Sequence, residues 1–122
     1  MKVAVDGANC EADGHPTSCE EPADGSVNAP TTGVTINGTP VGTHGGSMYF
    51  PSHAHEYKDT DDDGSKECTT YSSHSLDPDQ THSVTVNGEP IYRVGDSTTD
   101  PGSGGTAYII DSGGSHQVTH NA

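Results

Sequence analysis

Cysteine and histidine are the residue types in this chain with the clearest capacity for chemistry. The sequence has eight histidines and three cysteines, Cys10, Cys19 and Cys68. An odd number of cysteines excludes a complete set of disulfides. Two interpretations stay open: one disulfide, such as Cys19–Cys68, beside a free thiol, or ligation of a metal by thiolates. Thiolate sulfur and imidazole nitrogen together favour tetrahedral zinc, which a structural site surrounds with four protein ligands.

Other catalytic and ligand-binding motifs are absent from the sequence or incomplete. There is no Gly-x-Ser-x-Gly nucleophile motif, and no cysteine–histidine pair with an orienting group is recognisable. Gly64-Ser-Lys66 does not match the phosphate-binding Gly-Lys-Ser/Thr loop. Asp59–Gly64 resembles the opening of a calcium loop, but Thr70 stands at the twelfth position, where an acidic ligand is required. The sequence therefore predicts that the protein is not an enzyme, and it predicts an exposed acidic turn at 59–64.

A seven-residue sequence occurs twice and begins a third time. Val34-Thr-Ile-Asn-Gly-Thr-Pro40 recurs as Val84-Thr-Val-Asn-Gly-Glu-Pro90, and Val118-Thr-His-Asn121 repeats its first half. Asn-Gly between β-branched residues predicts a tight hairpin, because a type I′ turn needs φ > 0 at both central positions. Met1–Gly7 resembles the second half of the unit. Repeats of this kind indicate one supersecondary unit used several times. We therefore expect three related hairpins, the third formed by the two ends of the chain.

Composition limits the chain to one small all-β domain over residues 1–122. Only 27% of the residues are apolar, there is no Trp, and the 16 Gly and 8 Pro suit turns and short strands. No window shows helical apolar periodicity with caps, and Asp6–Pro30 has the composition of a long loop. Composition alone lies near the disordered class, but the strand–turn–strand repeats argue against disorder. A body with so little core needs added stability from a metal, a partner or both.

The charge of the chain is strongly one-sided. Asp and Glu total 18 against four Lys and Arg, which gives a net charge of −14. Such a charge repels nucleic acid and anionic membranes, so neither is an expected partner. An acidic, lysine-poor surface is similar to that of proteins from extreme halophiles, in which salt screens self-repulsion. No apolar stretch is long enough for a transmembrane helix or a signal peptide. If the protein leaves the cell, we therefore expect it to be made in the cytoplasm and to travel by another route, such as inside a particle.

The stretch Val84–Asp96 resembles the repeat of PAAR proteins, a family named for the tetrapeptide Pro-Ala-Ala-Arg. Pro90-Ile-Tyr-Arg93 stands at that tetrapeptide, and Val-Gly-Asp follows it as in the family. A strand at Thr106–Ile110 and a Gly/Ser turn at Asp111–Ser115 also match the family order. The resemblance implies a small cone of three pseudo-threefold β-hairpin repeats with long Gly/Pro-rich loops.

The resemblance also implies a structural role. PAAR proteins cap the trimeric β-helical spike of contractile tails, in type VI secretion systems, extracellular contractile injection systems and tailed viruses. They hold a Zn²⁺ near the point of the cone with His and Cys ligands. This chain departs from the family pattern at Asp100, where His or Cys is common, and in the segment His44–His82, which is longer than a family loop.

A zinc site in the loops at the point of the cone follows from this resemblance. Its expected ligands are drawn from Cys10, His15, Cys19, His53 and His55. Counting along the repeat places Cys10, four residues after Asp6, at the level of Asp100, four residues after Asp96. His53 and His55 are expected to bind one metal together only across a turn. His44 is a competing ligand if this arm of the cone is shorter.

The partner implied by the resemblance is a trimeric spike of the valine-glycine repeat type, capped by one copy of this chain. The expected spike-binding residues lie on strands whose edges the spike would cover: Val34, Ile36, Val84, Val86 and Val118. As the tip of a virion or tail-like particle, the protein would meet a target envelope transiently, without stable insertion into a membrane. The alternative is an acidic secreted binding module, or a small zinc enzyme whose open site holds three protein ligands and a water.

Overall fold

The fold is built from β-strands throughout the part of the chain that the structure describes. The computed structural model describes residues 1–14, 22–59, 66–114 and 118–119, with the backbone alone for 53–59 and 66–71. Over these residues there is no helix, and so none that is long and apolar enough to span a membrane. The expected all-β class is confirmed.

The strands are short and are numbered in chain order. They are β1 (Asn9–Ala12), β2 (Ala23–Asn28), β3 (Thr35–Ile36), β4 (Thr39–Pro40), β5 (Ser47–Phe50), β6 (His53–Asp59), β7 (Lys66–Tyr71), β8 (His74–Leu76), β9 (Thr85–Val86), β10 (Glu89–Pro90), β11 (Ser97–Thr99) and β12 (Thr106–Ile109).

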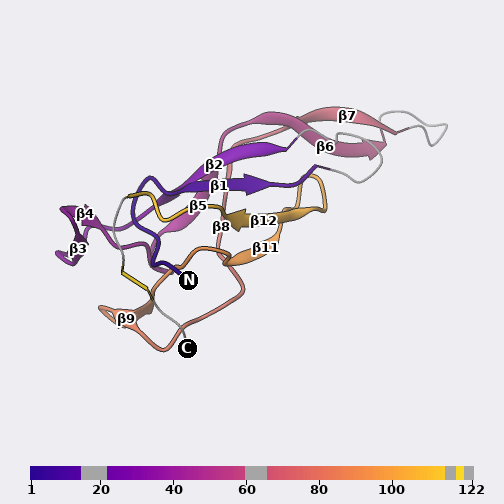
Figure 1. The fold of residues 1–122 in the computed structure, drawn as a ribbon. Helices are drawn as coiled ribbons and strands as arrows, with labels where there is room; N and C mark the ends of the chain where they lie inside the picture. The colour runs from indigo at the N-terminus through magenta and orange to yellow at the C-terminus, as the bar shows by residue number, and fades with distance from the viewer. Residues whose placement is uncertain (15–21, 60–65, 115–117, 120–122) are drawn as a thin grey trace.

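The repeated sequence forms small hairpins, β3–β4 and β9–β10, at one end of the molecule (Figure 1). In both hairpins the turn asparagine has φ of 52° and the following glycine has φ of 84°. Two positive φ values confirm the type I′ turns that Asn37-Gly38 and Asn87-Gly88 predict. The chain ends form the third unit as expected, because Lys2 makes an antiparallel bridge with Thr119.

The segments that follow the three turns join in a closed ring, which we call the base ring (residues 2–6, 40–44 and 90–94). Its centre consists of Ala4, Gly42 and Tyr92. Ala4 N–H donates to the Tyr92 carbonyl at 3.0 Å, Gly42 N–H to Ala4 at 2.9 Å, and Tyr92 N–H to Gly42 at 2.8 Å. Each segment thus donates to one neighbour and accepts from the other. The ring therefore has pseudo-threefold symmetry, and the three expected related hairpins are confirmed.

Equivalent hydrogen bonds of the base ring fix which residues correspond. The N–H groups of Asp6, His44 and Val94 donate to the carbonyls of Pro40, Pro90 and Lys2. Asp6 therefore corresponds to Val94, and the register counted in the sequence, which matched Asp6 with Asp96, is wrong by two residues. The count matched the two aspartates because both are acidic, whereas the backbone hydrogen bonds of the ring determine which residues correspond. The residue at the level of Asp100 is consequently Ala12, and Cys10 lies two residues before it.

Three longer antiparallel pairs, which we call the arms, extend from the base ring: β1–β2, β5–β8 and β11–β12. They form one curled six-stranded sheet in the order β11-β12-β1-β2-β5-β8 (Figure 1). The expectation of a loop over Asp6–Pro30 is wrong where β1 and β2 form. These strands contain mostly small and polar residues, so they lack the alternation that marks a strand in a sequence. Their backbones pair nonetheless, with Cys10 opposite Gly25 on one side and Ile109 on the other.

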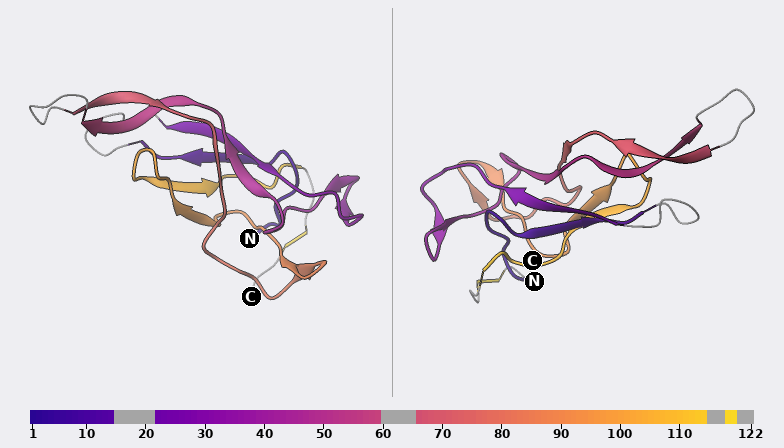
Figure 2. Two further views of the ribbon diagram at one scale, coloured as in Figure 1. Left: turned by 180° about the vertical axis from the view of Figure 1, so that it is seen from behind. Right: turned by 90° about the horizontal axis from the view of Figure 1, so that it is seen from above.

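A two-stranded extension, β6–β7, continues from the β5–β8 arm and projects beyond the six-stranded sheet (Figures 1 and 2). The backbone register shifts between Ala54 and Glu56, which places a β-bulge at His55. Residues 60–65, the greater part of the expected acidic turn, lie outside the described residues.

The core lies inside the curled sheet and is made of small side chains around a few large ones. Tyr92, Phe50, Met48 and Ile109 are its largest fully buried members. Burial raises the pKa of the Tyr92 hydroxyl well above its usual range, and Asp77 adds to the effect. The protonated hydroxyl donates to Asp77 Oδ1 at 3.0 Å, so it ties the centre of the base ring to the segment after β8.

Close packing at Gly25 of β2 gives a stability prediction. A Cβ there would overlap the Tyr49 carbonyl oxygen and lie 2.6 Å from the Phe50 ring. We expect Gly25→Ala to lower the free energy of unfolding by about 2–3 kcal/mol, because overpacking forces neighbouring strands apart. Urea denaturation measures this loss. The control is Gly45→Ala, whose Cβ would meet its nearest atoms at 3.4 Å or more. Equal stability of the two variants would contradict the described packing.

Candidate functional site

Three valines at equivalent positions of the base are exposed. The carbonyls of Val34, Val84 and Val118 accept hydrogen bonds from the N–H groups of Val41, Ile91 and Val3, at 3.2, 3.1 and 3.0 Å. Their side chains are 45%, 47% and 45% exposed. The matched bonding and exposure give each hairpin one outward apolar side chain. We call these three residues the valine triad.

The other two expected spike-binding residues, Ile36 and Val86, lie differently. They pack with Val3, Val41 and Ile91 in a second small core under the hairpins. Val86 is only 9% exposed, so its side chain is already covered within the chain. Ile36 and Val86, each two residues after the exposed valine of its hairpin, therefore contribute to folding of the base, whereas the valine triad is exposed.

Charge is distributed unevenly between the base and the rest of the chain. The base segments 1–6, 34–44, 84–94 and 118–119 contain Lys2, Arg93 and two acidic residues, Asp6 and Glu89. Every other Asp and Glu of the chain lies outside these segments. The valine triad therefore belongs to the least acidic part of an otherwise strongly acidic protein.

The strong negative charge of the chain gives a salt-dependence prediction. Reducing the salt concentration from molar to millimolar should lower the melting temperature by several degrees, because the net charge of −14 then repels itself with less screening. Circular dichroism melts in NaCl and in KCl measure the effect, and both salts should act alike if screening is the cause. An unchanged melting temperature across this range would remove the physical basis of a halophilic surface.

A buried histidine–aspartate pair lies at the distal ends of two arms. His74 Nε2 is 2.7 Å from Asp100 Oδ1, and the Asp100 side chain is fully buried. Asp100 Oδ2 accepts from the Ser103 N–H at 3.1 Å and from its hydroxyl at 3.2 Å. The His74 ring also stacks on Phe50, with centroids 5.6 Å apart. The pair therefore joins the β5–β8 arm to the β11–β12 arm. Neither His74 nor Asp100 was an expected site residue.

Among the expected metal ligands, only Cys10 has a described side chain. Cys10 is 1% exposed within the core, and its Sγ lies 3.8 Å from the Ala8 carbonyl oxygen. Burial, together with nearby Asp111, raises the pKa of the thiol to about 12. The raised pKa favours the thiol over the thiolate that binds zinc. His15 and Cys19 lie outside the described residues.

His53 and His55 lie on β6, for which the backbone is described. The bulge at His55 means that strict alternation does not hold between these two residues. In a regular strand, residues two apart lie on the same face, so the expectation that these histidines could share a metal only across a turn is wrong. Within the described residues, no group of three or more His, Cys, Asp or Glu side chains is placed to hold a metal.

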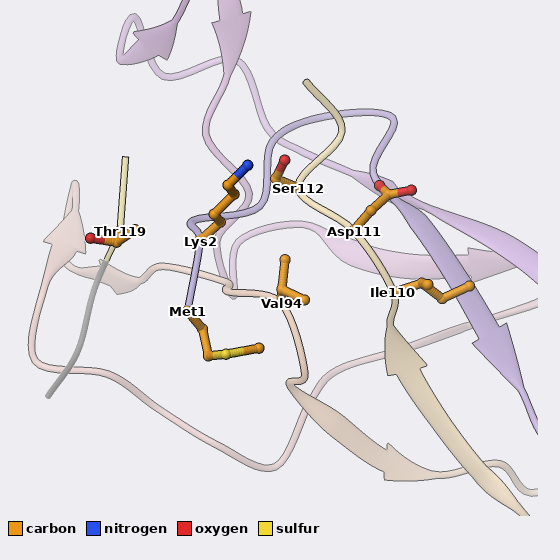
Figure 3. Close-up of a pocket in the computed structure, with 7 residues that line it drawn as sticks. All are labelled: Met1, Lys2, Val94, Ile110, Asp111, Ser112 and Thr119. Carbon is orange, nitrogen blue, oxygen red and sulfur yellow. The ribbon is translucent and has the colours of Figure 1, made fainter. Parts of the chain in front are cut away.

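A shallow hollow of about 410 Å³ lies beside the paired chain ends (Figure 3). Met1, Val94 and Ile110 contribute its apolar side chains, while Lys2 and Asp111 stand at its edge. The residues that correspond to Val94 in the other two sectors are Asp6 and His44, which are polar. The base is thus threefold in its backbone, whereas this hollow distinguishes one sector from the other two.

Comparison of the chain with models of known protein families, with curated proteins and with solved structures finds no match.

Proposed function

We propose that this protein is the structural tip of a trimeric spike, like the PAAR proteins that its repeat resembles. The observation that carries the proposal is the valine triad: three equivalent exposed side chains presented by one pseudo-threefold chain. A single chain with three similar hairpins can meet three identical protomers at once, one hairpin to each. The spike would be of the valine-glycine repeat type, with one tip per trimer.

The distribution of charge favours an orientation in which the base of the protein faces the spike. Proteins rarely bury many like charges in an interface, because each unpaired charge costs free energy when it loses water. The base segments have few charged residues, and they carry two of the 18 acidic residues, whereas the rest of the chain carries the other 16. The base would therefore face the spike, and the arms with the β6–β7 extension would face outward. In a virion or tail-like particle, that outward end would meet the target envelope transiently when the tail contracts.

Zinc is proposed as the structural metal of the outward end. With Cys10 held in the core, the remaining expected ligands are His15, Cys19, His53 and His55, which make a complete tetrahedral set of three imidazoles and one thiolate. Zinc there would tie the loop between β1 and β2 to the β6–β7 extension. Its contribution would be folding free energy rather than catalysis.

Co-purification tests the proposal directly. The tagged protein should retain the trimeric β-helical spike protein encoded in its gene neighbourhood, and negative-stain images should show added density at one end of the spike. A neighbourhood without sheath, tube and baseplate genes, or a spike that does not bind, would contradict the proposed function.

A further inference from the structure

The large apolar side chains that remain exposed gather mainly at the base of the protein. Among the described residues they are Met1, Val34, Tyr49, Val84, Ile110 and Val118. Three of them form the valine triad. Met1 and Ile110, which are 56% and 42% exposed, line the hollow beside the paired chain ends (Figure 3). Thr119, which follows Val118 in the chain, lines it as well. The hollow therefore adjoins the valine triad, and exposed apolar surface of this kind marks an interaction site.

Three equivalent residues of the base ring stand where the arms begin. Each arm starts three residues after one of them, Asp6, His44 or Val94. Asp6 Oδ1 accepts the N–H of Ala29 at 2.9 Å, and Ala29 follows β2, the second strand of the same arm. His44 Nε2 lies 2.9 Å from the carbonyl oxygen of Gln80, which follows β8 of its arm. In these two sectors a polar side chain thus fastens the returning segment of the arm to the base.

The third sector has an apolar residue at the same position. The side chain of Val94 has no atom that could form such a hydrogen bond. Val94 and Ile110, which follows β12 of the same arm, instead line the hollow of about 410 Å³ (Figure 3). The hollow therefore lies where the other two sectors carry a hydrogen bond between side chain and backbone.

Lys2 brings a positive charge to the edge of the hollow. The other charged side chain there, Asp111, already accepts three hydrogen bonds. Its Oδ1 accepts from the N–H groups of Asn9 and Gly113 at 3.0 Å each, and its Oδ2 accepts from Asn9 Nδ2 at 2.7 Å. Lys2 is one of only four Lys and Arg in a chain with a net charge of −14. A carboxylate of a partner would therefore be attracted here, whereas most of the surface would repel it.

We propose that the hollow is a socket for one apolar side chain of the spike, with a neighbouring carboxylate of the same spike chain paired to Lys2. The occupant belongs to the one protomer that meets the hairpin of Val118. This inference rests on the proposed spike-tip function and extends it, because the three protomers would not be held alike. Two of them would meet a hairpin of the base alone, and the third would also be anchored in the hollow.

Binding to the spike protein encoded in the gene neighbourhood, measured by surface plasmon resonance, tests the socket. Ile110→Asn should weaken binding at least about tenfold, because a large apolar contact surface is lost. Tyr49→Asn is the matched control: Tyr49 is 40% exposed on β5, does not line the hollow, and its loss should leave binding unchanged. Lys2→Gln should weaken binding at low salt, and this loss should shrink as added salt screens the charge pair.

Electron cryo-microscopy of the complex, without imposed symmetry, should show density from a single protomer in the hollow. An empty hollow, or equal spike binding by Ile110→Asn and Tyr49→Asn, would overturn the socket and leave the proposed spike-tip function standing. A dimer of the unaltered protein that Ile110→Asn abolishes would assign the hollow to a second copy of this chain and would also overturn it. A spike that does not bind the unaltered protein would contradict the proposed function, and the socket with it.

Discussion

Addition of a strong chelator at neutral pH is expected to lower the melting temperature of this protein by about 15 °C or more. Structural zinc sites contribute several kcal/mol or more of folding free energy to small domains, because the metal binds only the folded site. In a domain of this size, about 1 kcal/mol corresponds to several degrees in melting temperature. With 27% apolar residues and a small core, the chain has little other stability to replace that contribution.

Controls for the chelation experiment address the ligands and the coordination of the metal. Re-addition of Zn²⁺ should restore the original melting temperature. A His53→Ala, His55→Ala double variant should melt low with or without chelator, whereas Cys10→Ala should keep its response to chelator. A zinc-edge absorption spectrum should show four protein ligands, and a bound water would instead favour a zinc enzyme. A melting temperature that chelator does not change would disprove the metal.

The second large effect is expected at the valine triad. The double variant Val34→Asp, Val84→Asp should reduce binding to the trimeric spike by at least about a hundredfold. Each substitution places a carboxylate in an interface that would remove it from water, and an unpaired charge there costs about 2 kcal/mol or more. Both side chains are nearly half exposed in the free protein, so folding and metal content should be unchanged. Surface plasmon resonance against immobilised spike measures the loss.

Val86→Asp is the matched comparison for the double variant. Val86 is buried in the second small core with Val3, Val41 and Ile91, so an aspartate there should lower the free energy of unfolding before any partner is present. A variant on the arms, Asp24→Asn, should bind the spike normally. Full spike binding by the Val34→Asp, Val84→Asp protein would show that the valine triad is not the docking surface.

Local sequence signals predicted the base of the fold. Asn-Gly after Val-Thr specifies the type I′ hairpins within a few residues. The repeat itself indicated that the two ends of the chain would pair, and Lys2 and Thr119 form a bridge there. The arms were not predicted to the same extent. Cys10 and Gly25 pair through their backbones in β1 and β2, but small residues leave no alternating pattern to recognise.

The candidate site was predicted in part. The exposed valines followed from the repeat, but the burial of Val86 depends on the closed ring beneath it, which no single hairpin sequence contains. The pairing of His74 with Asp100 spans 26 positions and that of His82 with Asp96 spans 14. Neither separation matches a known sequence motif, so neither pair could be recognised from the sequence. The departure from the family at Asp100 was the one signal that could have identified it as a residue with a different partner.

The stoichiometry of the tip on its spike tests the central claim most directly. Native mass spectrometry of the protein mixed in excess with its trimeric spike should give a complex of three spike chains and one copy of this chain. A single copy follows from the three equivalent hairpins of one chain, which occupy all three protomers together. A complex with three copies of this chain per trimer would contradict the account, because each protomer would then bind its own tip and the pseudo-threefold base would not be the docking device.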